Sequence, residues 1–344
     1  MASGVIYRNV RSRDQLELFL LAAVSSLLLI RLYLYLTGYP QIGSGGLHIA
    51  HMLWGGALML AALITSLTFL GARSRTIVAL LGGAGFGIFI DELGKFITRD
   101  NNYFYKPTVG LIYAIFAVLY LIVNFLSRKQ TMSSRECQLN ALSQLEEVVA
   151  RDLDPIEKAR VMQLLSQADP HDPITRQLLR LLNSTGTIPR PAPKRFHRFL
   201  QRLTVQYEHF WRQRHSSLWV QIFFLAEVAL FVLGVLGTIY NSIDSVLDIF
   251  QGHVPYATEL VLGQLASSIV AAGFAVWGAL LLTRSRLHAY EQFRRATLIN
   301  LFLTQFFMFS RIQFGALPAF AFNMILLGLI SYAIRQEHRL RAAR

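Results

Sequence analysis

Ionisable side chains concentrate in the first hundred residues, inside or at the ends of apolar stretches. Such groups are expensive in a bilayer, and there they are usually paired or functional. At about 1.5 Å per helical residue, the helices would bring two imidazoles, two carboxylates, one ammonium and one guanidinium to a similar depth. We therefore predict one polar layer in the outer leaflet, made by six residues: Arg31, His48, His51, Asp91, Glu92 and Lys95.

One chemistry that this layer could perform is metal binding. His48 and His51 stand three residues apart in LHIAHMLWGG, so they share a helix face and can both present a ring nitrogen to one ion. With one or both of Asp91 and Glu92 they form a mixed nitrogen and oxygen set that suits a divalent metal such as zinc or iron. Asp100, in TRDNNYF, either turns the chain or adds a ligand. Asp91 and Glu92 would then be catalytic in a membrane-embedded hydrolase, whose metal-bound water attacks a lipid-like substrate.

Ion pairing and ion movement are the alternatives. Asp91 and Lys95 are at i and i+4, and Glu92 and Lys95 at i and i+3, so local pairs explain three groups without a ligand. Arg31 would neutralise the remaining carboxylate. In an ion- or proton-coupled transporter or channel, the carboxylates would instead bind a cation or proton, with Arg31 or Lys95 as counter-charge. Because successive helical residues point about 100° apart, one carboxylate is expected to face a given site while the other supports it or pairs elsewhere. A non-catalytic membrane scaffold is the third possibility.

The elements that must position this layer are apolar helices. Hydrophobic residues make up 53% of the 344 residues and charged residues 15%, against about 25% charged in soluble domains. Mean hydropathy is +0.41. Runs long enough to cross a hydrocarbon core of roughly 30 Å predict an all-α polytopic membrane protein of about eight spans, because they lack the alternation of barrel strands. The runs lie near 15–37, 47–70, 76–98, 107–126, 217–241, 257–283, 291–311 and 317–335.

Two groups of four spans flank a polar middle segment. We predict a four-helix group in 1–126, a helical cytoplasmic linker in 127–216 and a second four-helix group in 217–344. Asp154-Pro155 and Asp172-Pro173 predict helix starts in the linker. Most of the 33 basic residues fall in the linker, near the termini or in alternate connections. By the positive-inside rule, both termini are expected in the cytoplasm of a plasma (inner) membrane.

The same distribution of charge bears on partners. The net charge of +13 is explained by topology, and the sequence has no soluble basic face with groove-reading residues, so no nucleic acid is expected. The bilayer is the expected partner, and the basic aromatic stretch 193–215 is expected to contact anionic lipid headgroups. Assembly into a homo-oligomer is left open by the sequence.

Two further patterns concern helix packing. Gly83 and Gly87 have the G-x-x-x-G spacing, which predicts that their helix approaches a neighbour closely. In the second half, Glu227 and Asn300 are expected to form a hydrogen-bonded pair near mid-membrane. Three single amides in apolar runs would extend that pair: Gln264, Gln305 and Asn323.

Overall fold

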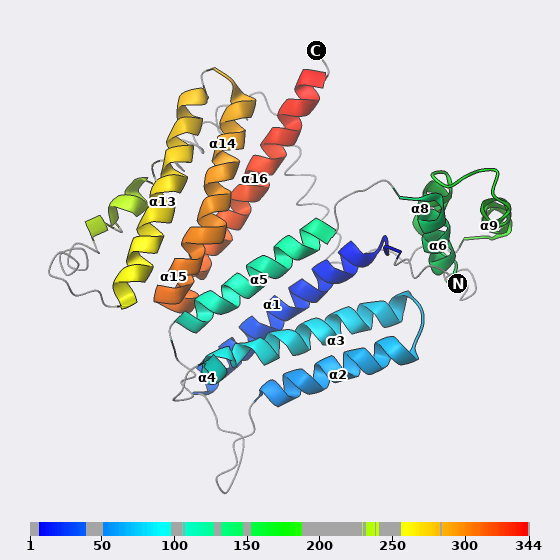
Figure 1. Cartoon of the computed structure of the whole chain (residues 1–344), viewed down its shortest axis with the longest axis horizontal. Helices are drawn as coiled ribbons and strands as arrows, with labels where there is room; N and C mark the ends of the chain where they lie inside the picture. The colour runs from blue at the N-terminus through cyan, green and yellow to red at the C-terminus, as the bar shows by residue number, and fades with distance from the viewer. Residues whose placement is uncertain are drawn as a thin grey trace, which may run out of the picture. The chain divides into compact units, whose positions relative to one another are not determined.

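The computed structural model describes residues 7–38, 51–97, 105, 107–126, 132–146, 153–187, 256–282 and 284–342, with a few more between 229 and 240. Over these ranges the chain is helical and forms no strand (Figure 1). It divides into two compact units. Unit 1 comprises Met1–Phe96 and Val118–Lys194, and unit 2 comprises Ile97–Ala117 and Arg195–Arg344.

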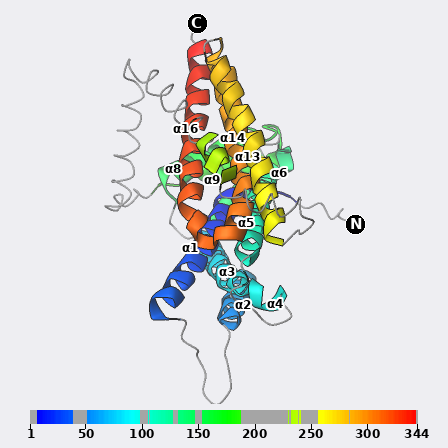
Figure 2. The ribbon, with the colours of Figure 1, turned by 90° about the vertical axis from the view of Figure 1, so that its left-hand side faces the viewer.

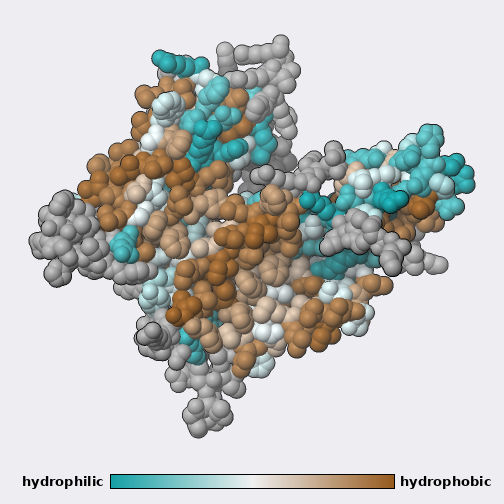
Figure 3. Space-filling model, in the orientation of Figure 1, coloured by the Kyte–Doolittle hydropathy of each residue, from teal (hydrophilic) through white to brown (hydrophobic). Residues whose placement is uncertain are grey.

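The helices have the length and composition of membrane-spanning segments. Within the described ranges, five helical stretches qualify: Ser12–Thr37, Ala72–Asp91, Pro107–Leu126, Glu259–Leu281 and Arg286–Arg335. Met52–Thr68 is equally apolar but has only 17 residues. Figure 3 shows hydrophobic surface over many of these helices. The all-helical, membrane-protein character predicted from the sequence is therefore confirmed, whereas the predicted run 217–241 lies largely outside the described residues.

Unit 1 is built around three apolar helices. These are α1 (Ser12–Thr37), α2 (Met52–Thr68) and α3 (Ala72–Asp91), followed by the short α4 (Leu93–Ile97). Helix α3 packs against both α1 and α2, and in Figure 1 it lies between them. The Ser26 hydroxyl of α1 donates to the Ala84 carbonyl of α3 at 3.0 Å. Helix α3 is thus the central element of this group.

Glycines on two faces of α3 allow both contacts. A Cβ atom at Gly87 would lie 2.1 Å from the Ala23 carbonyl oxygen of α1. On the other face, a Cβ atom at Gly85 would lie 2.6 Å from the Gly55 carbonyl oxygen of α2. The predicted close approach at Gly83 and Gly87 is therefore confirmed, and Gly85 with Gly55 adds a second one. Backbone contacts this close fix α3 relative to its two neighbours.

A small polar bundle completes unit 1. It consists of α6 (Ser134–Gln144), α8 (Pro155–Leu165) and α9 (Pro173–Ser184). Asp154 and Asp172 accept hydrogen bonds from backbone amides at the starts of α8 and α9, which confirms the predicted caps. Asn140 of α6 accepts a hydrogen bond from the Val10 amide at 2.9 Å. Arg75, in the first turn of α3, donates to a Glu146 carboxylate oxygen at 2.7 Å. The bundle therefore contacts the beginnings of α1 and α3.

The described helices of unit 2 include a hairpin. They are α13 (Tyr256–Leu281), α14 (Arg286–Ile299), the π-helix η1 (Asn300–Thr304), α15 (Gln305–Ile312), the 3₁₀-helix η2 (Gln313–Ala316) and α16 (Leu317–Ala342), and the hairpin runs from α14 to α16. Phe293 of α14 shares one apolar core with Leu326 and Ile330 of α16. Figures 1 and 2 both show α14 and α16 side by side. The stretch Arg286–Arg335 therefore reverses at η2 and contains two antiparallel segments. The beginning of α5 (Pro107–Leu126) also belongs to unit 2.

The glycine contacts give a first prediction. We expect Gly87→Ala to lower the stability of the protein by about 1 to 3 kcal/mol, because the added methyl group forces α3 away from α1. Gly82→Ala, on the same helix, is the matched control, since its Cβ would meet nothing closer than 3.5 Å. Thermal unfolding of the purified protein in detergent compares the two. Equal midpoints for the two variants would contradict the close contact.

Candidate functional site

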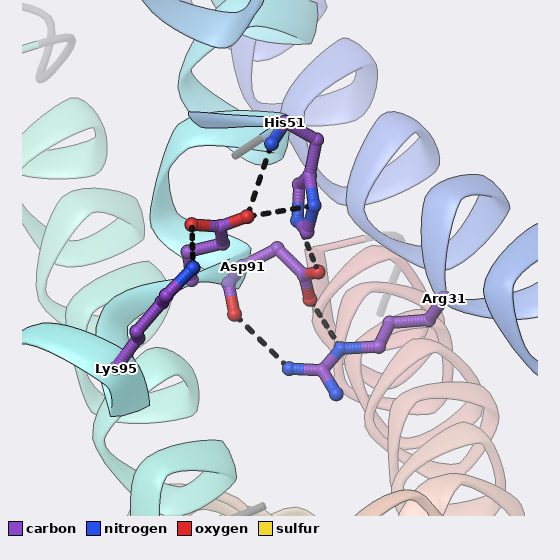
Figure 4. A network of polar contacts seen from close by, with 5 residues as sticks. Arg31, His51, Asp91 and Lys95 are labelled. Atoms are coloured by element: carbon purple, nitrogen blue, oxygen red, sulfur yellow. Dashed lines mark hydrogen bonds and ion pairs between the residues drawn. The ribbon is translucent and has the colours of Figure 1, made fainter. Parts of the chain in front are cut away.

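The two carboxylates of the predicted polar layer lie at a break between helices. Helix α3 ends at Asp91, Glu92 has φ −85° and ψ 9°, and α4 begins at Leu93. The predicted continuous helix over 76–98 is therefore wrong at this point. The fixed angle of about 100° between neighbouring side chains no longer applies, because it requires unbroken helical geometry. Both carboxylates contact the same imidazole, so Asp91 and Glu92 belong to one site (Figure 4).

Arg31 of α1 binds the end of α3. Its Nε donates to Asp91 Oδ1, and its Nη2 donates to the Asp91 backbone carbonyl at 3.0 Å. The Asp91 side chain is completely buried. The second contact places the guanidinium at the carboxyl end of α3, the terminus where the helix dipole favours a cation. The predicted neutralisation of one carboxylate by Arg31 is thus confirmed.

His51 lies between the two carboxylates, at the start of α2. Its Nε2 is 3.0 Å from Asp91 Oδ2, and its Nδ1 is 2.8 Å from Glu92 Oε1. The His51 backbone amide also donates to Glu92 Oε1 at 3.0 Å. Because the first amides of a helix lack intrahelical partners, the Glu92 carboxylate acts as an N-terminal cap for α2.

Lys95 completes the cluster from α4. Its Nζ lies 3.9 Å from Glu92 Oε2, which makes an ion pair that is too long for a hydrogen bond. The predicted i, i+3 pair of Lys95 with Glu92 is thus present. The predicted i, i+4 pair of Lys95 with Asp91 does not form, and Asp91 contacts Arg31 and His51 instead. Glu92 Oε2 is buried and has no hydrogen-bond partner in the described part of the chain. This oxygen is therefore open to a further donor.

The five groups form a row of alternating charge, which we call the charge row: Arg31, Asp91, His51, Glu92 and Lys95. An ionised carboxylate can only accept a hydrogen bond, and a neutral imidazole has a single N–H to donate. With a neutral His51 and two ionised carboxylates, one ring lone pair would face a carboxylate oxygen. A His51 protonated on both nitrogens can donate from Nε2 to Asp91 and forms an ion pair with Glu92 through Nδ1. The geometry therefore fits an imidazolium between two carboxylates, flanked by a guanidinium and an ammonium.

The metal interpretation does not gain support from this arrangement. Both ring nitrogens of His51 face protein carboxylates, so neither presents a lone pair to an ion. Within the described ranges, no group of three or more His, Cys, Asp or Glu side chains is placed to hold a metal. His48 and Asp100 lie outside the described residues. A metal that involves His48 thus stays a prediction from sequence alone.

Other predicted polar contacts lie in unit 2. Asn300 Nδ2 donates to Asn323 Oδ1 at 3.2 Å, while the expected partner Glu227 lies outside the described residues. Arg311 Nη1 donates a hydrogen bond to Gln264 Oε1 at 2.7 Å, a contact that no pattern in the sequence indicates. The basic stretch 193–215 also lies outside the described ranges, so its contact with headgroups stays a prediction.

Comparisons with known proteins do not add a family. No protein-family model, curated protein or solved structure matches the chain. The charge row is therefore the main indication of function in the described part of the chain.

A second prediction tests the pairing of Arg31 with Asp91. Asp91→Asn should lower stability by about 3 to 5 kcal/mol, because it removes the buried carboxylate that pairs with the mostly buried Arg31 guanidinium. Adding Arg31→Met should recover most of that loss. The measurement is a double-mutant cycle of unfolding midpoints in detergent. The control is Glu17→Gln, which breaks the exposed 2.7 Å pair with Arg13 on α1 and should change the midpoint little. Losses that simply add in the double variant would contradict the pairing.

Proposed function

We propose that the protein is a polytopic membrane protein that moves protons across the bilayer, with the charge row as its proton-binding site. The observation that carries the proposal is the placement of one imidazole between two buried carboxylates. Ionisable groups inside membrane helices are costly, and they commonly mark proton relays. Of the functions that the sequence leaves open, this is the ion- or proton-coupled transporter or channel.

The charge balance of the row supports proton uptake and release. With an imidazolium, three cations face two carboxylates and the row carries a net charge of +1. Loss of one proton leaves two cations and two anions. Desolvation penalises a net charge on the buried row, whereas the carboxylates on both sides of His51 attract a positive charge between them. These opposing effects suit a site that exchanges a proton.

The basic side chains of the charge row are partly exposed. The side chains of Arg31, His51 and Lys95 retain 13%, 18% and 26% exposure, whereas those of Asp91 and Glu92 retain 0% and 2%. The carboxylates are therefore shielded while the basic groups reach the surface of unit 1. Glu92 Oε2, which lacks a hydrogen-bond partner in the described part of the chain, can accept a proton or a water.

The topology that completes this proposal has about eight spans in two groups of four. Both termini and the linker would lie in the cytoplasm of a plasma membrane, following the distribution of basic residues. The charge row would then lie in the outer leaflet. The hydrolase and scaffold interpretations do not require a protonated His51, which separates them from proton movement.

A third prediction tests the function directly. Protein reconstituted in liposomes with an internal pH-sensitive dye should acidify the lumen when a potassium diffusion potential, negative inside, is imposed with valinomycin. His51→Gln should reduce this flux at least tenfold, because an amide cannot carry the proton between the carboxylates. His288→Gln is the matched control, since His288 is an exposed histidine of unit 2.

Two results would contradict the proposal. One is a wild-type flux no faster than that of protein-free liposomes. The other is an unchanged flux in His51→Gln, with the variant reconstituted to the same density as the wild type.

A further inference from the structure

A row of hydrogen-bonding side chains runs through the otherwise apolar helices of unit 2. Thr304 donates to the Ser267 hydroxyl at 3.0 Å, and Ser267 donates to the Gln264 carbonyl at 2.9 Å. Asn300 lies one turn before Thr304, and Arg311 lies two turns after it. We call this set the polar seam: Gln264, Ser267, Asn300, Thr304, Gln305, Arg311 and Asn323. From Asn300 to Arg311 it extends roughly 17 Å along the helix, about half of a hydrocarbon core.

Gln305 is the member of the seam whose hydrogen bonds are missing. Its side chain is 0% exposed, and neither Nε2 nor Oε1 has a hydrogen-bond partner among the described residues. A buried primary amide without partners is expensive, and more so among membrane-spanning helices, where lipid offers no partner either. Buried polar groups that lack protein partners are commonly satisfied by ordered water.

The backbone beside Gln305 is irregular as well. The π-helix η1 ends directly before Gln305. The backbone N–H of Gln305 donates to the Asn300 carbonyl, five residues back. The Tyr113 hydroxyl of α5 donates to the Leu301 carbonyl in this turn. Single turns of π-helix inside α-helices occur frequently at functional sites. The side-chain amide of Gln305 without partners and the π-helical turn beside it are therefore two independent features of the same place.

The chemistry of the seam indicates what fills it. Apart from Arg311, its side chains are amides and hydroxyls, which both donate and accept and carry no charge. Such a lining has no carboxylate or imidazole to hold a cation or exchange a proton. It matches water, which uses donors and acceptors in the same way.

We propose that unit 2 contains a water-binding site at Gln305, inside the membrane-spanning helices. Water bonded to the Gln305 side-chain amide supplies hydrogen-bond partners for both Nε2 and Oε1. It thereby adds Gln305 to the hydrogen-bonded groups of the polar seam. This hydrated site is separate from the charge row and does not depend on proton movement. It gives the second half of the chain a polar element of its own.

Radiolytic hydroxyl-radical labelling with mass spectrometry tests the proposal, because radicals formed from bound water oxidise the side chains beside it. Phe309 lies one turn after Gln305 and is 5% exposed, whereas Phe293 is 0% exposed in an apolar core of the same unit. In the intact wild-type protein, Phe309 should be oxidised at least fivefold faster than Phe293. In Gln305→Met, the Phe309 rate should fall to that of Phe293.

Equal rates at Phe309 and Phe293 in the wild type would overturn the proposal without any variant. A Phe309 rate that stays high in a folded Gln305→Met protein would overturn it too, since the water would then not be held by the amide. An unfolding midpoint higher in Gln305→Met than in the wild type would show that the amide was dry.

Discussion

Two buried carboxylates at the end of one helix set the organisation of unit 1. Asp91 and Glu92 are almost without exposure, so each needs cations and donors from neighbouring elements. Arg31 comes from α1, His51 from the start of α2 and Lys95 from α4. The same contacts satisfy the last carbonyl of α3 and the first amide of α2. Charge pairing and helix capping are therefore one network, which joins the ends of three helices. Apolar contacts alone would not specify how these ends align.

Close helix packing makes this network possible. The arginine of α1 and the histidine of α2 reach the end of α3 only because both helices approach its backbone closely at Gly87 and Gly85. The small bundle contacts the residues before α1 through Asn140 and the first turn of α3 through Arg75. Helices α1 and α3 are thus held at the bundle end, by glycines along their length, and at the charge row. A proton that enters or leaves the row changes the charge at one of these three positions.

Composition and spacing predict the helices and the membership of the layer, but not its contacts. Three features follow directly from residue patterns: the apolar helices from run length, the close approach at Gly87 from the glycine spacing, and the pairing of Arg31 with a carboxylate from the cost of charge in lipid. The break after Asp91 is not among the predicted features, although LGKFITR places Gly94, a poor helix former, soon after it. Around that break, both carboxylates contact His51, and Lys95 keeps the predicted contact with Glu92 but not the predicted contact with Asp91. Likewise, no sequence signal foretells a π-turn before Gln305.

The central claim is that His51 bridges two ionised carboxylates as an imidazolium. Nitrogen-15 magnetic resonance of protein labelled at histidine, with His51 assigned by the His51→Gln variant, reports directly whether each ring nitrogen bears a proton. If His51 bridges the carboxylates as an imidazolium, both of its ring nitrogens bear a proton in the folded protein. A ring that has one bare nitrogen at every pH at which the protein is folded would contradict it.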